Sequence, residues 1–593
     1  MSSYNKRPVK CVENSKGRVF SGDSAILECL RSHLTGNSWI LTVETYPGVS
    51  EERIRQMLDA LHPDLIVSAG DILKDEDSLK PLLENILTDD RVFGRMYYGE
   101  FTDFIDLRKL DYFRAKIEGT GGKIAVYGFG ASLLSGSRIC GSDRCGNDRN
   151  SGRGYELSIY VDVSRWEIQL RYRAGMPNYF SDNPGEDILK KFKQGYFLEW
   201  RIADKWKMAC MDRMEYYIDA NRDNDLIMIR KDLFEEALRK EASEPFRVVP
   251  YFDPGVWGGQ WMKKVCGLDP SKPNYAWSFD GVPEENSICF DFGGTVMEMP
   301  AMNLILKHPK ELLGPKVYAR FGAEFPIRFD FLDTMGGQNL SLQVHPTTEY
   351  IHRQFGMAYT QDESYYILDA KENSGVYLGL REGIDMQMMA DDLRAAEAGK
   401  ISFPAEKYVN FFPCKKHDHF LIPAGTIHCS AADTMVLEIS ATPYNFTFKL
   451  WDWDRVGLDG LPRPIHIEDG LTNIQWNRTT AWVRENLVNQ FEALGQTEDV
   501  MEERTGLHEY EFIETRRFTQ TGKSYHDAGD GFHICNLIDG REAVIESTEG
   551  TFAPYTVHYA ETFIIPAAAG RYTVRPSAPG EKIVFIKAYV RNR

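Results

Sequence analysis

The stretch Ser341-Leu-Gln-Val-His-Pro346 places Gln343 and His345 two positions apart in a run that alternates like a β-strand. Alternate residues of a strand lie on the same face, so both side chains are expected to point the same way. A lone histidine on a strand is more often a packing residue than a metal ligand. The pair therefore becomes informative only if further ligand-type residues lie on neighbouring strands.

Two later stretches supply such residues. Glu363 opens Glu-Ser-Tyr-Tyr-Ile-Leu368, which is predicted to be a second strand. His428 lies in Ile422-Pro-Ala-Gly-Thr-Ile-His-Cys429, where Pro-Ala-Gly predicts a tight turn into a third strand. Two imidazoles, one carboxylate and one carboxamide suit zinc or a similar divalent ion, and the strands of a small barrel can bring them together. The set carries one negative charge, so a bound divalent cation would favour an anionic or oxygen-rich substrate.

These residues lie in motifs that together resemble type I mannose-6-phosphate isomerase. The motifs are Gln-Val-His-Pro, the Glu before Tyr-Tyr-Ile-Leu, Pro-Ala-Gly-Thr-Ile-His and Leu437-Glu-Ile439. The likeness begins near Pro250-Tyr-Phe-Asp-Pro-Gly-Val-Trp-Gly-Gly259 and extends over residues 244–593. It implies a zinc-dependent cupin enzyme with one Zn²⁺ per chain, held by Gln343, His345, Glu363 and His428.

The resemblance also implies a reaction, the interconversion of mannose 6-phosphate and fructose 6-phosphate through a cis-enediolate. Such a reaction needs a base that moves a proton between C1 and C2, positive charge beside the developing oxyanion, and an anchor for the phosphate. The metal answers the second need as a Lewis acid. Glu438, on the strand Val436-Leu-Glu-Ile439, is the candidate for a carboxylate at the site, as base or as partner of a ligand.

Three positions depart from the family pattern. Gln361 stands where the family commonly has a lysine, Asn445 where it has an aspartate and Lys449 where it has an arginine. Glutamine has no titratable proton near neutrality, so a base or cationic role is lost at Gln361. Lys449 keeps a positive charge without the bidentate guanidinium fork, and it is predicted to be a catalytic residue together with Glu438.

The departures leave several functions open. The protein could run the same reaction with altered residues, act on a related sugar phosphate, or bind a phosphosugar as a regulator without turnover. A cupin isomerase or epimerase acting on an unphosphorylated sugar is a further alternative.

Residues 1–243 are predicted to form an α/β domain with a parallel sheet. Short apolar strands alternate with amphipathic segments, which favours helices on both faces of the sheet. The predicted strands are Trp39–Val43, Asp64–Val67, Lys123–Tyr127 and Leu157–Val161. The turn Glu44–Ser50 lies where a nucleotide kinase has its phosphate loop, but it lacks Gly-Lys-Ser/Thr. We therefore expect a degenerate kinase-like domain that does not transfer phosphate from ATP.

The remainder is predicted to be β-rich. Residues 244–478 are expected to form the catalytic cupin, a jelly-roll barrel that includes one helix over 385–399. Residues 479–505 are expected to be an acidic, partly helical connector. Residues 506–593 are predicted to form a smaller C-terminal cupin-like β-domain.

Composition narrows the class of partner. A net charge of -18 argues against nucleic acid and anionic membranes, and no apolar run is long enough to span a bilayer. The start lacks the apolar core of a signal peptide, so a cytoplasmic location is expected. The ten cysteines show no Cys-x-x-Cys pair, and even the closest two, Cys140 and Cys145, are predicted to be free thiols.

Other residues compete for a role at the site. His352 falls in a predicted helix and is expected at the surface or beside a ligand. His417-Asp-His419 alternates like a pair of ligands, but the motif context favours His345 and His428. Trp451-Asp-Trp453 is expected to pack in the core rather than stack on a sugar.

Overall fold

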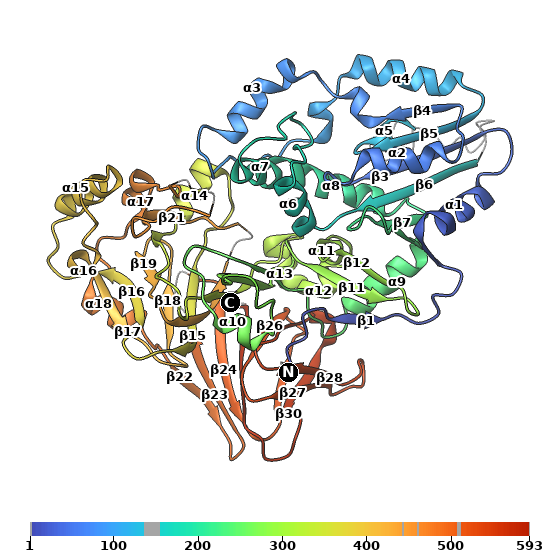
Figure 1. Cartoon of the computed structure of the whole chain (residues 1–593). Helices are drawn as coiled ribbons and strands as arrows, with labels where there is room; N and C mark the ends of the chain where they lie inside the picture. Colours follow the sequence, from blue (N-terminus) through green and yellow to red (C-terminus); the bar gives the residue numbers. More distant parts are fainter. Residues whose placement is uncertain are drawn as a thin grey trace. The chain divides into compact units, whose positions relative to one another are not determined.

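The chain, seen as a computed structural model, divides into two compact units (Figure 1). The structure describes residues 3–135, 155–441, 444–458, 460, 462–506 and 511–591. The α/β unit consists of residues 9–239 and 287–307, and the β unit of residues 1–8, 240–286 and 308–593. The chain is thus multidomain and β-rich, as predicted. Two short segments, 1–8 and 287–307, belong to the unit on the other side of the boundary predicted at residue 243.

A seven-stranded sheet forms the centre of the α/β unit. Its strands, in spatial order, are β2 (Val19–Ser21), β8 (Ile227–Arg230), β7 (Tyr216–Asp219), β6 (Tyr155–Asp162), β3 (Trp39–Thr45), β5 (Lys123–Gly128) and β4 (Leu65–Ser68). The four predicted strands correspond to β3, β4, β5 and β6 and run parallel, as predicted. Strand β7, which was not predicted, also runs parallel to β6, whereas β8 and β2 form an antiparallel edge. Strand β3 is buried along its whole length, and apart from Glu44 its residues are apolar or β-branched, as expected for a strand covered on both faces.

Helices connect these strands. They are α1 (Gly22–His33), α2 (Glu51–Asp59), α3 (Glu76–Leu87), α4 (Leu107–Gly119), α5 (Ala131–Leu134), α6 (Arg165–Arg173), α7 (Ile188–Gln194), α8 (Trp200–Met211), α9 (Lys231–Glu241) and α11 (Met302–Lys307). Helix α2 begins after Ser50, whose hydroxyl accepts a hydrogen bond from the Arg53 N–H. The segment 287–307 adds β11 (Ser287–Asp291) and β12 (Val296–Pro300), which form a small sheet with β1 (Val9–Cys11).

The segment 287–307 belongs to the α/β unit because its polar side chains complete a buried network there. The Lys207 ammonium lies 2.8 Å from the Asp162 carboxylate, and both side chains are buried. Asn303 accepts a hydrogen bond from Lys207 and donates one to Asp162. A buried ion pair needs such additional partners, and this one is supplied from a distant part of the sequence.

Two antiparallel sheets form what we call the first sandwich of the β unit. The six-stranded sheet has the order β18 (His419–Ile422), β15 (Glu363–Ala370), β20 (Thr434–Ser440), β13 (Arg328–Asp333), β10 (Trp277–Gly281) and β9 (Tyr251–Asp253). The five-stranded sheet has the order β17 (Val409–Pro413), β16 (Gly375–Leu380), β19 (His428–Ser430), β14 (Leu342–Val344) and β21 (Phe448–Trp451).

Two further antiparallel sheets form the second sandwich. The larger has the order β22 (Glu492–Gln496), β23 (Val500–Gly506), β24 (Ile513–Gln520), β31 (Ile583–Val590), β26 (His533–Asp539) and β29 (Thr562–Ile565). The smaller has the order β25 (Ser524–Asp527), β30 (Arg571–Pro576), β27 (Glu542–Ser547) and β28 (Tyr555–His558). Apolar residues of both sheets, among them Phe518, Ile545, Tyr572 and Phe585, form one buried core.

Helices of the β unit are short. They are α10 (Trp261–Val265), α12 (Pro309–Leu313), α13 (Pro315–Phe321), α14 (Thr348–Phe355), α15 (Met386–Glu397), α16 (Ala405–Tyr408), α17 (Ile467–Asn473) and α18 (Thr480–Asn486). Helix α15 corresponds to the predicted helix over 385–399 and begins where the Asp385 carboxylate accepts a hydrogen bond from the Met388 N–H.

The expected connector is not a connector over most of its length. Residues 479–505 contain α18 and the strands β22 and β23, and β23 pairs with β24 of the second sandwich. Every residue of the edge strand β22 is exposed, and most of β23 is only partly buried. An edge strand that is exposed to solvent on both faces lacks the alternation of apolar and polar residues that identifies a half-buried strand. The acidic sequence of β22 was therefore interpreted as part of a connector.

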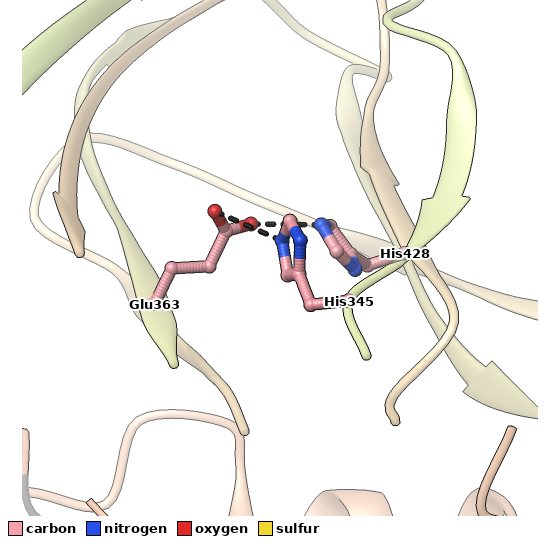
Figure 2. A group of neighbouring side chains, drawn as sticks. All are labelled: His345, Glu363 and His428. Atoms are coloured by element: carbon pink, nitrogen blue, oxygen red, sulfur yellow. Dashed lines mark ion pairs between the residues drawn. The ribbon is translucent and has the colours of Figure 1, made fainter. Parts of the chain in front are cut away.

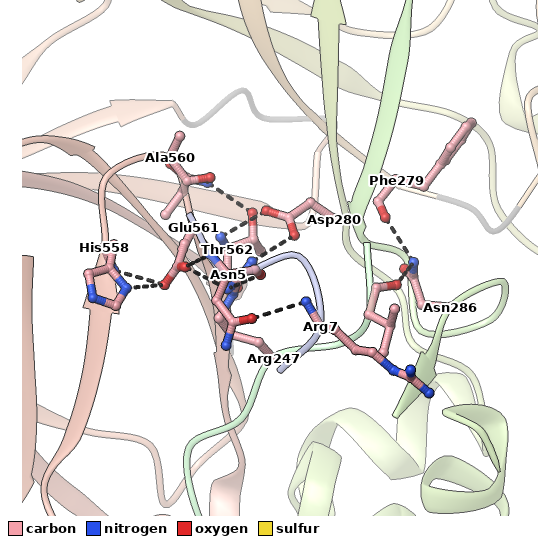
Figure 3. Close-up of polar contacts among 12 residues, drawn as sticks. Asn5, Arg7, Arg247, Phe279, Asp280, Asn286, His558, Ala560, Glu561 and Thr562 are labelled. Carbon is pink, nitrogen blue, oxygen red and sulfur yellow. Dashed lines mark hydrogen bonds and ion pairs between the residues drawn. The ribbon is translucent and has the colours of Figure 1, made fainter. Parts of the chain in front are cut away.

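The N-terminal segment 1–8 is held in the β unit by Arg247 (Figure 3). The buried guanidinium donates to the Asn5 carbonyl oxygen at 2.9 Å and lies 2.8 Å from Glu561 and 3.3 Å from Asp280. Asp280 lies on β10 of the first sandwich, whereas Glu561 immediately precedes β29 of the second. Arg247 therefore joins three parts of the β unit that are far apart in sequence.

Among the described residues, none of the helices combines the length and the apolar character that a membrane span requires. Six of the cysteines in this part of the chain are free thiols, as predicted: Cys29, Cys210, Cys266, Cys414, Cys429 and Cys535. Cys140 and Cys145 lie outside the described residues.

Candidate metal centre

Three buried side chains converge between the two sheets of the first sandwich (Figure 2). The Glu363 carboxylate lies 3.1 Å from His345 Nε2 through one oxygen and 2.7 Å from His428 Nε2 through the other. The ligand-type atoms of all three residues lie within 4.8 Å of one another. This spacing leaves the two imidazoles and the carboxylate facing a common point.

The strand pairing explains how this cluster forms. Gln343 on β14 is paired with His428, the first residue of β19, so their side chains share one face of the five-stranded sheet. His345 follows β14 on the same face, two residues beyond Gln343. Glu363 is the first residue of β15 in the other sheet. Gln343 joins the group, with its side-chain amide 3.2 Å from His428 Nε2.

Backbone carbonyl groups fix both imidazole rings. His345 Nδ1 lies 2.8 Å from the Phe446 carbonyl oxygen, and His428 Nδ1 lies 2.9 Å from that of Thr426. Each Nδ1 must carry the proton to donate to a carbonyl, so in the neutral ring the Nε2 lone pair points at the cluster. This is the orientation that metal-ligating histidines adopt.

The unsatisfied atoms of the cluster fit a cation. Among the described residues, His345 Nε2 and Glu363 Oε1 are buried and accept or donate no hydrogen bond of acceptable geometry. Such atoms are costly to bury without a partner. A divalent ion with nitrogen and oxygen ligands would satisfy both of them together, and two imidazoles with a carboxylate are a common zinc donor set.

Electrostatic coupling within the cluster is strong. Burial raises the pKa of Glu363, but the adjacent His345 and His428 outweigh burial and hold that pKa well below its ordinary value. Burial lowers the pKa of His345, and the charge of Glu363 outweighs it, so the net pKa is raised. The carboxylate is therefore ionised at neutral pH and available as a ligand.

Glu438 lies on β20, the strand paired with β15, which carries Glu363. Strand β20 pairs Ser440 with Glu363 and Glu438 with Tyr365, so Glu438 shares the face of Glu363 and sits two residues further along. Its side chain is buried, and burial together with the charges of Glu363 and Asp330 raises its pKa well above the ordinary value. A carboxyl group with a raised pKa is suited to proton transfer.

Arg328 and Asp330 extend this face, and neither was predicted as a site residue. Both residues lie on β13, where Arg328 pairs with Ser440 and Asp330 pairs with Glu438 of β20. The Arg328 guanidinium donates a hydrogen bond to the Asp330 carboxylate at 2.7 Å. Both are buried. The signal in the sequence was the alternation of Arg328 and Asp330 within the apolar strand Ile327–Leu332, which places two charged groups on one inward face.

Gln361, which the resemblance placed among the groups around the site, contacts the cluster directly. Its amide nitrogen donates to Glu363 at 3.1 Å, and its carbonyl oxygen accepts the Phe446 N–H at 2.8 Å. Phe446 is also the residue whose carbonyl holds His345. Gln361 therefore orients one ligand-type side chain and the backbone segment that orients another.

Lys449 and Asn445 lie at the same end of the sandwich. Lys449 on β21 is paired with Gln343, so its side chain extends on the face that carries Gln343 and His428. It is partly buried, whereas Asn445 is exposed and accepts a hydrogen bond from the Thr447 hydroxyl. The structure thus brings Lys449, but not Asn445, onto the face of the cluster.

The competing histidines lie elsewhere. His419 is paired with Tyr366, which points to the face opposite Glu363 and Tyr365, and burial lowers the pKa of His419 to about 3. His417 contacts the Tyr366 hydroxyl at 3.1 Å. His352 lies on α14 and is exposed. As expected, Trp451 and Trp453 pack against each other, with ring centroids 4.2 Å apart.

Different parts of the chain are similar to different known proteins. A family described as a domain of unknown function, DUF8485, matches residues 22–243. The probable mannose-6-phosphate isomerase GmuF of Bacillus subtilis (strain 168) is 21% identical over 337 residues, which is 56% of this chain and 96% of the relative. The mannose-6-phosphate isomerase of Streptococcus mutans is 26% identical over 247 residues, 41% of this chain and 72% of the relative.

A crystal structure of the mannose 6-phosphate isomerase from Bacillus subtilis covers 58% of this chain and all of its own, with 17% identity and a TM-score of 0.47. The relatives are therefore mannose-6-phosphate isomerases that match part of this chain at low identity.

Proposed function

We propose that the protein is a zinc-dependent aldose–ketose isomerase of the cupin type that interconverts mannose 6-phosphate and fructose 6-phosphate. The buried cluster of His345, Glu363 and His428, with Gln343 beside it, carries this proposal. The names of the relatives support it, since a probable mannose-6-phosphate isomerase matches 56% of this chain and a second mannose-6-phosphate isomerase matches 41%. Gln361 and Lys449, two of the three residues that differ from the family pattern, lie around this cluster, whose four members are unchanged.

The four residues would hold one zinc ion per chain. When bound, zinc supplies a Lewis acid that stabilises negative charge on the sugar oxygens at C1 and C2. Gln361 keeps Glu363 and the Phe446 backbone in place, while the carbonyl groups of Phe446 and Thr426 hold the rings. These contacts fix the geometry before substrate arrives, which is the condition for electrostatic catalysis.

The proton transfer between C1 and C2 falls to Glu438. Its raised pKa and its position on the face of Glu363 suit a group that takes and returns a proton. Lys449 supplies a positive charge on the adjacent sheet and replaces part of the charge that is absent at Gln361. Its length and single ammonium suit an anionic oxygen or phosphate contact.

A coupled assay tests the proposal. Conversion of fructose 6-phosphate to mannose 6-phosphate is measured with the zinc-loaded chain, with the chain after chelation, and after zinc is restored. We expect activity that chelation removes and zinc restores. Absence of turnover with full zinc occupancy, accompanied by saturable binding of either sugar phosphate, would instead support the regulator that binds without catalysis.

The substrate phosphate is tested in the same assay. Competition by inorganic phosphate is expected if the site anchors the phosphate group. Turnover of unphosphorylated mannose or fructose without such competition would favour the alternative of an isomerase or epimerase for free sugars.

A further inference from the structure

The second sandwich contains a cavity of about 400 Å³ at one end of its interior. Three buried side chains line it: Lys587 on β31, His526 on β25 and His533 on β26. Below them lies the apolar core that includes Phe518 and Phe585. The cavity is therefore an open polar end of an otherwise apolar interior, on a different sandwich from the candidate metal centre.

Lys587 is held without an ion pair. Its side chain is 6% exposed, and its ammonium lies 3.3 Å from His526 Nδ1, 4.9 Å from the centre of the Phe518 ring and 5.5 Å from that of Tyr589. Within the described residues it makes no salt bridge. Lysine side chains are almost never this buried unless the ammonium is paired with a carboxylate. The burial of Lys587 therefore needs an explanation other than an ion pair.

The His526 ring is positioned to accept a hydrogen bond from the Lys587 amine. Its Nε2 lies 2.8 Å from the Ser524 hydroxyl, and that hydroxyl is 3.4 Å from the Val574 carbonyl, to which it donates. Ser524 therefore accepts from Nε2–H, which leaves a lone pair on Nδ1 facing the Lys587 amine. Burial, followed by the charges of Lys587 and Arg516, lowers the pKa of His526 well below its ordinary value, so the ring is neutral.

The charges around the cavity are mutually compensated. The Arg516 guanidinium lies 2.7 Å from Glu502 and 2.6 Å from Glu514. His533 is neutral as well, since burial and the charge of Lys587 lower its pKa, and its Nδ1 lies 2.7 Å from the Tyr572 hydroxyl. Two further lining carboxylates, Asp527 and Asp530, are paired with Arg571 at 3.6 Å and with Lys316 at 2.9 Å, so among the described residues Lys587 is a lining cation without a carboxylate partner.

We propose that this cavity is a second ligand site, in which the Lys587 amine forms a Schiff base with a small hydroxylated aldehyde or ketone. The neutral amine attacks the carbonyl carbon, a C–N bond forms, and the carbonyl oxygen becomes a hydroxyl by taking a proton. Loss of that hydroxyl with a further proton as water then gives the imine, with His526 Nδ1 accepting and returning the protons that nitrogen releases. Overall, one amine and one carbonyl compound give one imine and one molecule of water.

The environment supports an available amine. Burial lowers the pKa of Lys587 to about 8. Near pH 7 its neutral fraction is then on the order of a hundredfold larger than that of an ordinary lysine. The site is independent of the proposed isomerase activity, because none of its residues belongs to the first sandwich.

Reductive trapping tests the proposal on the full-length, zinc-loaded chain. The protein is incubated at pH 7 with limiting glycolaldehyde and cyanoborohydride, and the modified lysines are mapped by peptide mass spectrometry. We expect Lys587 to be labelled at least about tenfold faster than the exposed Lys523, because its amine is more often neutral. Labelling of Lys587 no faster than Lys523 in the wild-type chain would overturn the proposal.

Variants separate the chemistry from folding. His526→Asn is expected to slow labelling of Lys587 several-fold while that of Lys523 stays unchanged, because the proton acceptor is lost. Isomerase activity, if present, is expected to be unaffected. If His526→Asn labels Lys587 at the parent rate, His526 has no role in the proton transfer and that part of the proposal fails.

Discussion

The two sandwiches of the β unit use the same arrangement of antiparallel sheets but bury opposite kinds of charge. Between the sheets of the first, the Glu363 carboxylate faces two imidazoles, with Glu438 and Asp330 on the same face. In the second, Lys587 faces a neutral imidazole and two aromatic rings. The first interior is thus prepared for a cation and the second for a molecule that reacts with an amine.

The difference shows that the scaffold leaves the chemistry open. In both sandwiches polar groups come from paired positions on adjacent strands, Gln343 with His428 in one case and Lys587 with Arg516 in the other. Register decides which side chains meet, and residue type at a few inward positions decides what they bind. Four predictions test whether the two interiors are as distinct as this comparison implies.

The largest effect is expected from removing both ring ligands of the first sandwich. His345→Ala/His428→Ala should strip the metal and abolish isomerase activity, because two of the four donors are lost from a closed, buried site. Elemental analysis and the coupled assay measure both effects. The double variant His352→Ala/His417→Ala removes two histidines that lie outside the cluster and should keep full metal content. Full metal occupancy in His345→Ala/His428→Ala would show that the metal binds elsewhere, the histidines of the second sandwich included.

The next effect concerns the residue that ties the sandwiches together. Arg247→Met leaves Asp280 and Glu561 buried without their shared cation, and it should lower the free energy of unfolding by about 3–5 kcal/mol. Denaturation followed by circular dichroism measures this change. Arg541→Met, at an exposed position, is the matched control and should change stability by less than about 0.5 kcal/mol. Equal stability of the two variants would mean that the sandwiches do not depend on Arg247.

The third prediction concerns the cost of the buried amine. Burial lowers the pKa of Lys587 to about 8, so the unfolded chain binds more protons than the folded chain between about pH 8 and its ordinary pKa near 10.5. The charged form therefore destabilises the fold by up to about 3 kcal/mol below pH 8, and this cost disappears as the pH rises toward 10.5. Lys587→Met should raise the melting temperature at pH 7, and the gain should shrink between pH 8 and 10. A gain that stays constant over this range would show that Lys587 titrates normally.

The sequence predicted the candidate metal centre better than its surroundings. Gln343, His345, Glu363 and His428 stand in recognisable local patterns, and the structure brings them together. Arg328 and Asp330 were not predicted to adjoin the site, because their proximity depends on the register of β13. Register is set by pairing with strands that are distant in sequence, so no local pattern reports it.

The same distinction holds for the fold. The parallel strands of the α/β unit were predicted from their apolar sequences, since buried strands carry a continuous signal. The exposed edge strand β22 carries no such signal and was mistaken for part of a connector. The sequence also did not predict that residues 287–307 belong to the α/β unit. This membership depends on contacts between residues distant in sequence, such as those of Asn303 with Lys207 and Asp162.

The smallest effect is expected from Lys449, which tests whether the first sandwich has replaced the charge missing at Gln361. Lys449 is paired with Gln343, so its ammonium extends on the face of the cluster, and Lys449→Met keeps the length of the side chain while removing the charge. We expect kcat/KM to fall by at least about tenfold, which corresponds to about 1.4 kcal/mol of transition-state stabilisation. Metal content should stay unchanged, because Lys449 is not a ligand. Lys449→Arg keeps the charge and should retain activity toward mannose 6-phosphate. Comparison of the two variants therefore separates the effect of the charge from the effect of the side-chain shape. If Lys449→Met turns over at the parent rate with full metal content, the positive charge needed by the reaction comes from another group on this face, for which the buried Arg328 is the first residue to test.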